Sequence, residues 1–198
     1  MGAVGGTGLA LPLNLALPVR GFVDVAARAE AAGYDRLWAA EAGNNDAFGL
    51  LTAVALGTST VGLATGVVPI YTRTPSLMAQ SAGTLQDVSG GRFTLGVGVS
   101  SKMIVERWNG VPYDKPLGRI KEYVEVVREL LDGKRVDRDG TYYDVHGYFL
   151  MMNNPQPPPP IILGALNEQM LRAGGEVADG VCLNWIGAHA VADALEHV

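Results

Sequence analysis

Cysteine, histidine and basic runs are scarce in this chain, and each scarcity excludes a class of protein. Cys182 is the one cysteine, so the chain has no intrachain disulfide and fits a reducing compartment, the cytoplasm. The three histidines show no paired spacing, so we expect no metal site. A net charge of −5 without a basic run argues against a nucleic-acid partner. No stretch of about eighteen residues lacks glycine, proline and charge, so we expect neither a transmembrane helix nor a membrane partner.

The chain instead has 26 glycines, 11 prolines and 48% hydrophobic residues, a composition typical of a soluble globular protein with one core or a small pair. Short apolar runs alternate with segments whose apolar residues recur at helical spacing. Strands are expected at 9–13, 36–40, 63–68, 93–99, 161–164 and 181–185. Helices are expected at 19–32, 46–57, 75–88, 116–132, 167–179 and 190–197, with Asp46, Thr74 and Asn167 as start signals.

Three segments depart from this alternation. Residues 102–115 are expected to form a loop that carries Trp108 and Tyr113. Residues 135–150 contain Asp139-Gly140, a hairpin-turn signal between β-rich flanks, so we expect a small antiparallel excursion there. Residues 153–160 are rich in proline and are expected to form a stiff, extended connector.

The series of about six β–α units favours either a (β/α) barrel or an open doubly wound sheet. Ligands bind such sheets beyond the carboxyl ends of the strands, which directs attention to residues 67–72 and 98–102. A barrel of eight units typically needs about 250 residues, so we expect an abbreviated barrel whose last two β–α units are absent. Uncovered first and last strands would then favour self-association, as in a homodimer.

Four sequence blocks, in this order and spacing, resemble the luciferase-like monooxygenase family, and within it the branch that uses the deazaflavin coenzyme F420. The blocks are LATGVVPIYTRTP (63–75), LQDVSGGRFTLGVGVSS (85–101), WNGVPYDKPLGRIKEYVEVVRELLDG (108–133) and MLRAGGEVADGVCLNW (170–185). The resemblance covers nearly the whole chain. It implies an α/β fold of the TIM-type (β/α) barrel class, with residues 1–198 as a single domain and residues 134–160 as an insertion.

The resemblance also implies a flavin or deazaflavin at the C-terminal mouth of the barrel. The bond between Gly66 and Val67 is expected to be a cis peptide under the ring. Gly98 lets backbone approach a ligand closely, and the start of the helix at 167 offers free N–H groups to a phosphodiester, provided that Glu168 points away. The residues expected to bind the cofactor are Gly66, Val67, Val68, Gly98, Val99, Ser100, Ser101, Leu166, Asn167, Gln169 and Met170.

Glu41 is the acid at the tip of the second strand, and its match in F420 enzymes of the family lies near the deazaflavin. It is the candidate catalytic residue; the alternative is a solvated loop carboxylate. Trp108 and Trp185 are candidate walls of the substrate pocket, with packing in a loop or core as the alternative. Other residues expected near the mouth are Asn44, Asn45 and Asp46, and the cations Arg73 and Lys102, which could meet the polyanionic tail of F420.

The function that these features favour is an F420-dependent oxidoreductase, which transfers hydride between the deazaflavin and an unknown small organic substrate. One alternative is an FMN-dependent monooxygenase or reductase on the same barrel. Another is a non-catalytic or degenerate barrel that binds a cofactor. Cys182 has apolar neighbours, which favours a buried position over a nucleophilic role.

Overall fold

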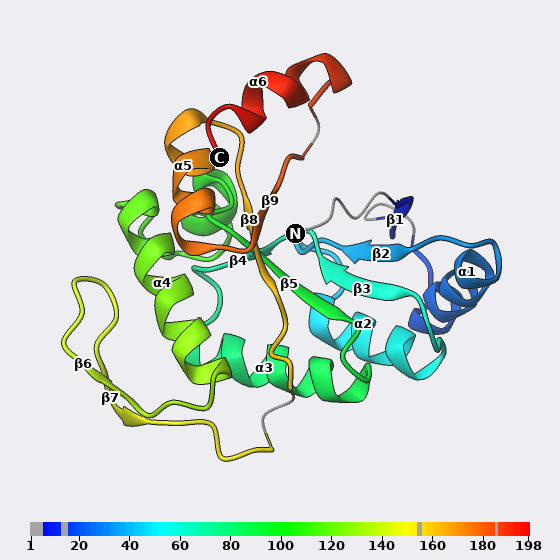
Figure 1. Cartoon of the computed structure of the whole chain (residues 1–198), viewed down its shortest axis with the longest axis horizontal. Helices are drawn as coiled ribbons and strands as arrows, with labels where there is room; N and C mark the ends of the chain where they lie inside the picture. The colour runs from blue at the N-terminus through cyan, green and yellow to red at the C-terminus, as the bar shows by residue number, and fades with distance from the viewer. Residues whose placement is uncertain (1–5, 13–15, 154–155, 185) are drawn as a thin grey trace.

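The computed structural model describes residues 6–12, 16–153, 156–184 and 186–198, and its centre is a curled parallel sheet (Figure 1). The seven-stranded sheet has the order β1-β2-β3-β5-β8-β9, and the short strand β4 pairs with β5. The helices α1 to α5 follow the outside of this sheet in chain order (Figure 1). A curled parallel sheet with helices on its outer side is a half-barrel, which confirms the TIM-type class predicted from the sequence.

The elements alternate along the chain as expected. The strands of the sheet are β1 (Gly8–Ala10), β2 (Arg36–Ala39), β3 (Gly62–Thr65), β4 (Val68–Pro69), β5 (Phe93–Gly98), β8 (Ile161–Gly164) and β9 (Gly180–Cys182). The helices are α1 (Val19–Ala31), α2 (Ala47–Leu56), α3 (Pro75–Val88), α4 (Pro116–Leu131), α5 (Glu168–Val177) and α6 (Val191–Leu195). Residues 13 and 185, the predicted ends of the first and last strands, lie outside the described ranges, as do residues 154–155 of the predicted connector.

The three predicted start signals each cap a helix. The carboxylate of Asp46 accepts a hydrogen bond from the amide of Gly49 at 2.6 Å. The hydroxyl of Thr74 accepts from the amide of Leu77, and the side chain of Asn167 accepts from the amide of Met170 at 3.0 Å. Each bond satisfies an amide that the first turn of a helix leaves without a partner, which stabilises a helix by about 1 kcal/mol.

The core lies between the sheet and the surrounding helices. Leu37, Leu63 and Phe93 are in register across β2, β3 and β5, and none of them is more than 1% exposed. The ring of Phe48 on α2 meets Phe93 edge to face, with 6.0 Å between the ring centroids. Burial of each such side chain contributes about 1.5–3 kcal/mol. Because side chains alternate between the faces of a strand, Gly98 lies on the opposite, inner face from Phe93.

The structure corrects the sequence analysis in three places. The strand predicted at 63–68 is broken into β3 and β4 between Thr65 and Val68. The loop predicted at 102–115 contains a π-helix, Met103–Trp108. Asp139-Gly140 does not form a two-residue turn, because the hairpin strands β6 (Val136–Arg138) and β7 (Val145–Tyr148) are separated by a longer loop.

Glu122 on α4 explains the longer loop. Its carboxylate accepts hydrogen bonds from the amides of Thr141, Tyr142 and Tyr143, at 3.1, 3.1 and 2.8 Å. Charge-assisted bonds of this kind are stronger than a neutral turn bond, so the tertiary contact determines the conformation of the loop.

The strands β1 and β9 are at the two ends of the sheet order. That a second copy of the chain covers these edges stays a prediction. Within the described ranges, no helix combines the length and the apolar character needed to cross a bilayer.

Candidate functional site

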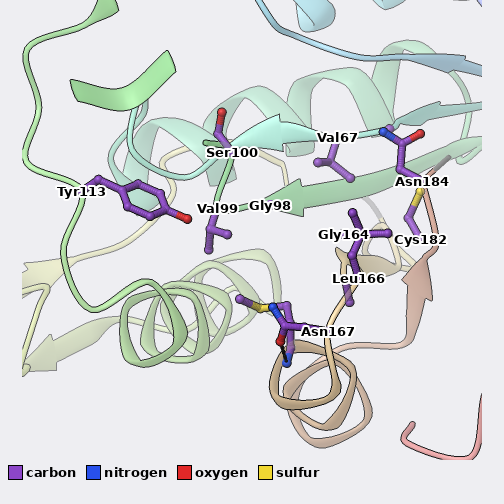
Figure 2. Close-up of a pocket in the computed structure, with 13 residues that line it drawn as sticks. Val67, Gly98, Val99, Ser100, Tyr113, Gly164, Leu166, Asn167, Cys182 and Asn184 are labelled. Atoms are coloured by element: carbon purple, nitrogen blue, oxygen red, sulfur yellow. Dashed lines mark hydrogen bonds between the residues drawn. The ribbon is translucent and has the colours of Figure 1, made fainter. Parts of the chain in front are cut away.

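A cavity of about 350 Å³ lies beyond the carboxyl ends of the strands, at the place that the strand-end rule indicates (Figure 2). It receives residues from the ends of β5, β8 and β9, from the break between β3 and β4, from the segments that follow β5, β8 and β9 or precede α4, and from the start of α5. Its lining consists of Gly66, Val67, Gly98, Val99, Ser100, Tyr113, Gly164, Ala165, Leu166, Asn167, Met170, Cys182 and Asn184. We call this space the first cavity.

Two glycines make room for Val67 in the wall of the first cavity. A Cβ atom on Gly98 would lie 2.6 Å from Cγ2 of Val67, and one on Gly164 would lie 3.1 Å from the same atom. Larger residues at these positions would therefore push the valine into the cavity. The Gly66–Val67 peptide bond is cis, as the family resemblance implied.

The surface of the first cavity is apolar with a few polar points. Val67, Val99 and Leu166 supply apolar surface, and Figure 2 shows them turned towards the same space. The polar side chains are those of Ser100, Tyr113, Asn167 and Asn184, together with the thiol of Cys182. Among the described residues, no lysine, arginine, aspartate or glutamate lines this cavity. Such a mixture is typical of a site for a flat organic ligand with polar edges.

Burial affects the ionisation of Cys182 and Tyr113. It raises the pKa of the Cys182 thiol and the pKa of the Tyr113 phenol above their ordinary values, because the charged form of each would lose its hydration. Both groups therefore keep their protons at neutral pH.

The first turn of α5 faces the first cavity through Asn167 and Met170. The carboxylate of Glu168 is turned away and pairs with the guanidinium of Arg172 at 2.9 Å. The repulsion that Glu168 would exert on an anionic ligand is thereby reduced, as the sequence analysis required. Gln169, which was expected to bind the cofactor, does not line the cavity.

A second cavity, of about 370 Å³, contains the predicted catalytic residue. One carboxylate oxygen of Glu41 accepts a hydrogen bond from Nη1 of Arg73 at 2.6 Å, and the other accepts from the amide of Ala47 at 3.1 Å. Arg73 also pairs with Asp46 and lies over the ring of Phe48, 5.1 Å from its centroid. Both carboxylate oxygens of Glu41 are therefore engaged, and the side chains of Glu41 and Arg73 are mostly buried, whereas that of Asp46 is exposed.

The carboxylates of Glu41 and Asp46 stabilise the charged form of Arg73. Burial alone would lower the pKa of Arg73, but the hydrogen bond that Arg73 donates to Glu41 and the charges of Glu41 and Asp46 raise the pKa above its ordinary value. Trp108 also lines the second cavity and is 57% exposed at the end of the π-helix. The candidate catalytic acid and one candidate substrate wall thus share a cavity that is distinct from the first.

The structure brings most of the predicted cofactor residues together. Those that line the first cavity are Gly66, Val67, Gly98, Val99, Ser100, Leu166, Asn167 and Met170. Val68, Ser101 and Gln169 do not line it, and Val68 is fully buried. Lys102 is exposed and pairs with Glu106. Trp185 lies outside the described residues.

The sequence analysis missed several lining residues. They are Tyr113, Gly164, Ala165, Cys182 and Asn184. Four of these end or follow the strands β8 and β9, so the strand-end rule applied to those strands would have found them. Tyr113 has no such signal, because it precedes α4 by a few residues and reaches the cavity from outside the sheet.

Comparison with known proteins gives one consistent family. The sequence pattern of the luciferase-like monooxygenase family matches residues 4–198. A 5,10-methylenetetrahydromethanopterin reductase of Archaeoglobus fulgidus is 38% identical over 157 residues, which are 79% of this chain and 46% of that protein. The enzyme of the same name from Methanolobus tindarius is 35% identical over 168 residues, 84% of this chain and 51% of that protein.

Solved structures agree with the sequence comparison. The coenzyme F420 dependent tetrahydromethanopterin reductase from Methanopyrus kandleri superimposes with a TM-score of 0.80 and 27% identity, covering 89% of this chain and 55% of that one. The chain therefore spans about half the length of the relatives it matches. The described residues contain no cluster of His, Cys, Asp and Glu that could hold a metal ion.

Proposed function

The chain belongs to the luciferase-like monooxygenase family, and from this we infer that it is an oxidoreductase that binds coenzyme F420 in the first cavity. It would transfer hydride between the deazaflavin and a small organic substrate. Two of its relatives are named as reductases of 5,10-methylenetetrahydromethanopterin, and a structural neighbour is named as dependent on F420. FMN is the alternative coenzyme.

The observation that carries this proposal is the cradle around Val67. Gly98 and Gly164 leave space on the inner face of the sheet, and Val67 fills part of that space and presents an apolar surface to the cavity. A flat ring fits such a surface, while Ser100, Tyr113 and Asn184 offer hydrogen bonds at its edges. The chemistry of the lining therefore suits a deazaflavin ring.

The protein's part in the reaction would be positioning and exclusion of water. When bound, the deazaflavin supplies the hydride chemistry. Val67 and the two glycines behind it would fix the plane of the ring, and Val99, Leu166 and other apolar neighbours would keep water from the reacting carbon. Glu41 as a proton donor or acceptor stays a prediction, and its pairing with Arg73 in the second cavity would have to open before it could act.

A binding titration tests the coenzyme. The purified protein is titrated with F420 and, separately, with FMN, and the change in ligand fluorescence gives each dissociation constant. We expect F420 to bind more tightly than FMN. Tight FMN binding without F420 binding would favour the flavin-dependent alternative, and no binding of either would contradict the proposal.

A turnover assay tests the reaction. Reduced F420 is mixed with the protein and 5,10-methylenetetrahydromethanopterin, since this is the substrate named for two relatives, and then with a panel of small ketones and imines. Oxidation of the coenzyme with one of these acceptors is the expected result. Tight binding without oxidation across the panel would favour the non-catalytic alternative.

A further inference from the structure

Tyr113 enters the first cavity from the segment that joins the π-helix Met103–Trp108 to α4. Figure 2 shows its ring extending from this segment, with the hydroxyl directed towards Val99. The side chain is half-buried, and burial of its phenol raises the pKa, so the group keeps its proton at neutral pH. Tyr113 therefore offers a hydrogen-bond donor to whatever occupies the cavity.

The Tyr113 hydroxyl differs from those of Tyr71 and Tyr123 in having no hydrogen-bond partner among the described residues. The hydroxyl of Tyr71 donates to the carbonyl oxygen of Asp114 at 2.9 Å, and that of Tyr123 donates to the carbonyl oxygen of Arg73 at 3.0 Å. Within the described ranges, no residue forms a hydrogen bond with the Tyr113 hydroxyl. A phenol that is half-buried usually finds a partner, so this one is available to a ligand.

The rest of Tyr113 is held in place. Its ring lies against that of Tyr71, with 5.3 Å between centroids and 34° between the planes. Its amide donates to a carboxylate oxygen of Glu106 at 3.2 Å. The next residue, Asp114, is held by the guanidinium of Arg119, whose Nε lies 3.0 Å from Oδ1. Because the side chain is already ordered, a bond to a ligand would cost little conformational entropy.

Tyr113 shares the first cavity with two other side-chain donors, the hydroxyl of Ser100 and the amide of Asn184, but of these three it alone enters from the segment before α4. Among the described lining residues, only Tyr113 and Cys182 have a titratable side chain, and a thiol is a weak donor. The side chain of Asn167 is already used to cap α5. An acceptor oxygen on the side of a bound ring that faces the segment before α4 would therefore face the Tyr113 hydroxyl.

We propose that Tyr113 donates a hydrogen bond to an acceptor oxygen of the coenzyme in the first cavity, and so helps to orient it. This inference rests on the proposed function in its choice of coenzyme. It adds a ligand-contacting residue that comes from outside the sheet, from the segment before α4.

The variant Tyr113→Phe tests the inference, because it removes the hydroxyl and keeps the ring that stacks on Tyr71. Loss of one neutral hydrogen bond should weaken F420 binding about three- to tenfold. The absorbance spectrum of the bound deazaflavin should also shift relative to that in the unmodified protein. The urea midpoint of unfolding should stay unchanged, since no protein group loses a partner.

The variant Tyr148→Phe is the matched control. Tyr148 ends the hairpin strand β7, and its hydroxyl accepts a hydrogen bond from the side chain of Gln80 on α3. Tyr148 does not line the first cavity. The variant should leave the dissociation constant for F420 unchanged. Equal dissociation constants for Tyr113→Phe and the unmodified protein would overturn the inference, as would a loss of binding that follows only a loss of stability.

The failure of the coenzyme assignment can be told apart from the failure of this inference. If the unmodified protein binds FMN and not F420, the proposed function is wrong, and the same two variants are titrated with FMN. Weaker FMN binding by Tyr113→Phe alone would then support a ligand contact through this hydroxyl. If neither coenzyme binds the unmodified protein, both proposals are overturned.

Discussion

The substitution Gly98→Ala should damage both the stability and the ligand site, because it fills the space that Val67 occupies. The new Cβ would lie 2.6 Å from Cγ2 of Val67, whereas carbon atoms in favourable contact are about 3.5–4.0 Å apart. The overlap is therefore about 1 Å. A valine side chain has few alternative rotamers, and Gly164 on the neighbouring strand is close to the same methyl group of Val67.

The magnitude follows from the cost of overpacking. Relief of such an overlap requires movement of the backbone or of Val67, which typically costs about 1–3 kcal/mol. Because Val67 lines the first cavity, its displacement should also narrow the cavity and weaken F420 binding by at least about tenfold. Gly164→Ala, whose Cβ would lie 3.1 Å from the same atom, should show smaller effects of the same kind.

Urea unfolding and fluorescence titration together measure these two effects. Gly21→Ala is the matched control, because it is the same chemical change at a half-buried position in the first turn of α1, where a Cβ would have ordinary contacts of 3.6 Å or more. It should leave F420 binding unchanged and slightly raise stability. The reasoning would be refuted if Gly98→Ala unfolded at the same urea concentration as the unmodified protein and bound F420 equally well.

Three further predictions concern single side chains. Glu30 accepts hydrogen bonds from the amides of Thr60, Val61 and Ser59, and these bonds lower the pKa of its carboxyl from 4.5 to about 2. Glu30→Gln should therefore lower the free energy of unfolding by about 1–2 kcal/mol after allowance for solvent screening. Because the pKa of Glu30 is lower in the folded than in the unfolded state, the difference in stability should be complete above about pH 4.5 and should shrink as the pH falls towards 2. Urea unfolding at several pH values measures this dependence. The control Glu196→Gln, at an exposed position, should not show it. Alkylation of Cys182, followed by mass spectrometry, should be slowed by bound F420, and an equal rate with and without ligand would place the coenzyme elsewhere. Arg73→Met should lower the free energy of unfolding by about 2–4 kcal/mol, because it leaves the carboxylate of Glu41 without its main partner. The double variant Arg73→Met with Glu41→Gln should recover part of this loss. Equal stability of Arg73→Met and the unmodified protein in urea unfolding would contradict this account.

Signals within a few residues were sufficient to predict the elements. A hydroxyl or carboxylate before an apolar periodic segment is a local feature, and Asp46, Thr74 and Asn167 each cap the helix that they were expected to begin. Gly90 after α3 and Gly133 after α4 both have positive φ, as a glycine that ends a helix commonly does.

Tertiary contacts produced the features that could not be predicted. Glu41 and Arg73 are 32 residues apart, and neither neighbourhood indicates the pair. Asp139-Gly140 is a strong hairpin signal, but Glu122, from another part of the chain, binds the loop amides and determines a longer connection. In the hairpin, the charged partner Glu122 therefore outweighs the local turn preference of Asp139-Gly140.

The site itself shows why a rule that selects segments does not select residues. The strand-end rule led to stretches that contribute residues to the first cavity, yet Val67 lines this cavity while Val68 is buried in the core, and Ser100 lines it while Ser101 does not. Adjacent residues on extended backbone point to opposite faces, so an error of one position moves a side chain out of the site. The strand is interrupted between Thr65 and Val68, and Ser100 has a positive φ. Each departure from extended backbone changes the face of the sheet to which the following side chains point. A sequence pattern does not carry that information, and for this reason residues such as Tyr113 become visible only once the backbone path is known.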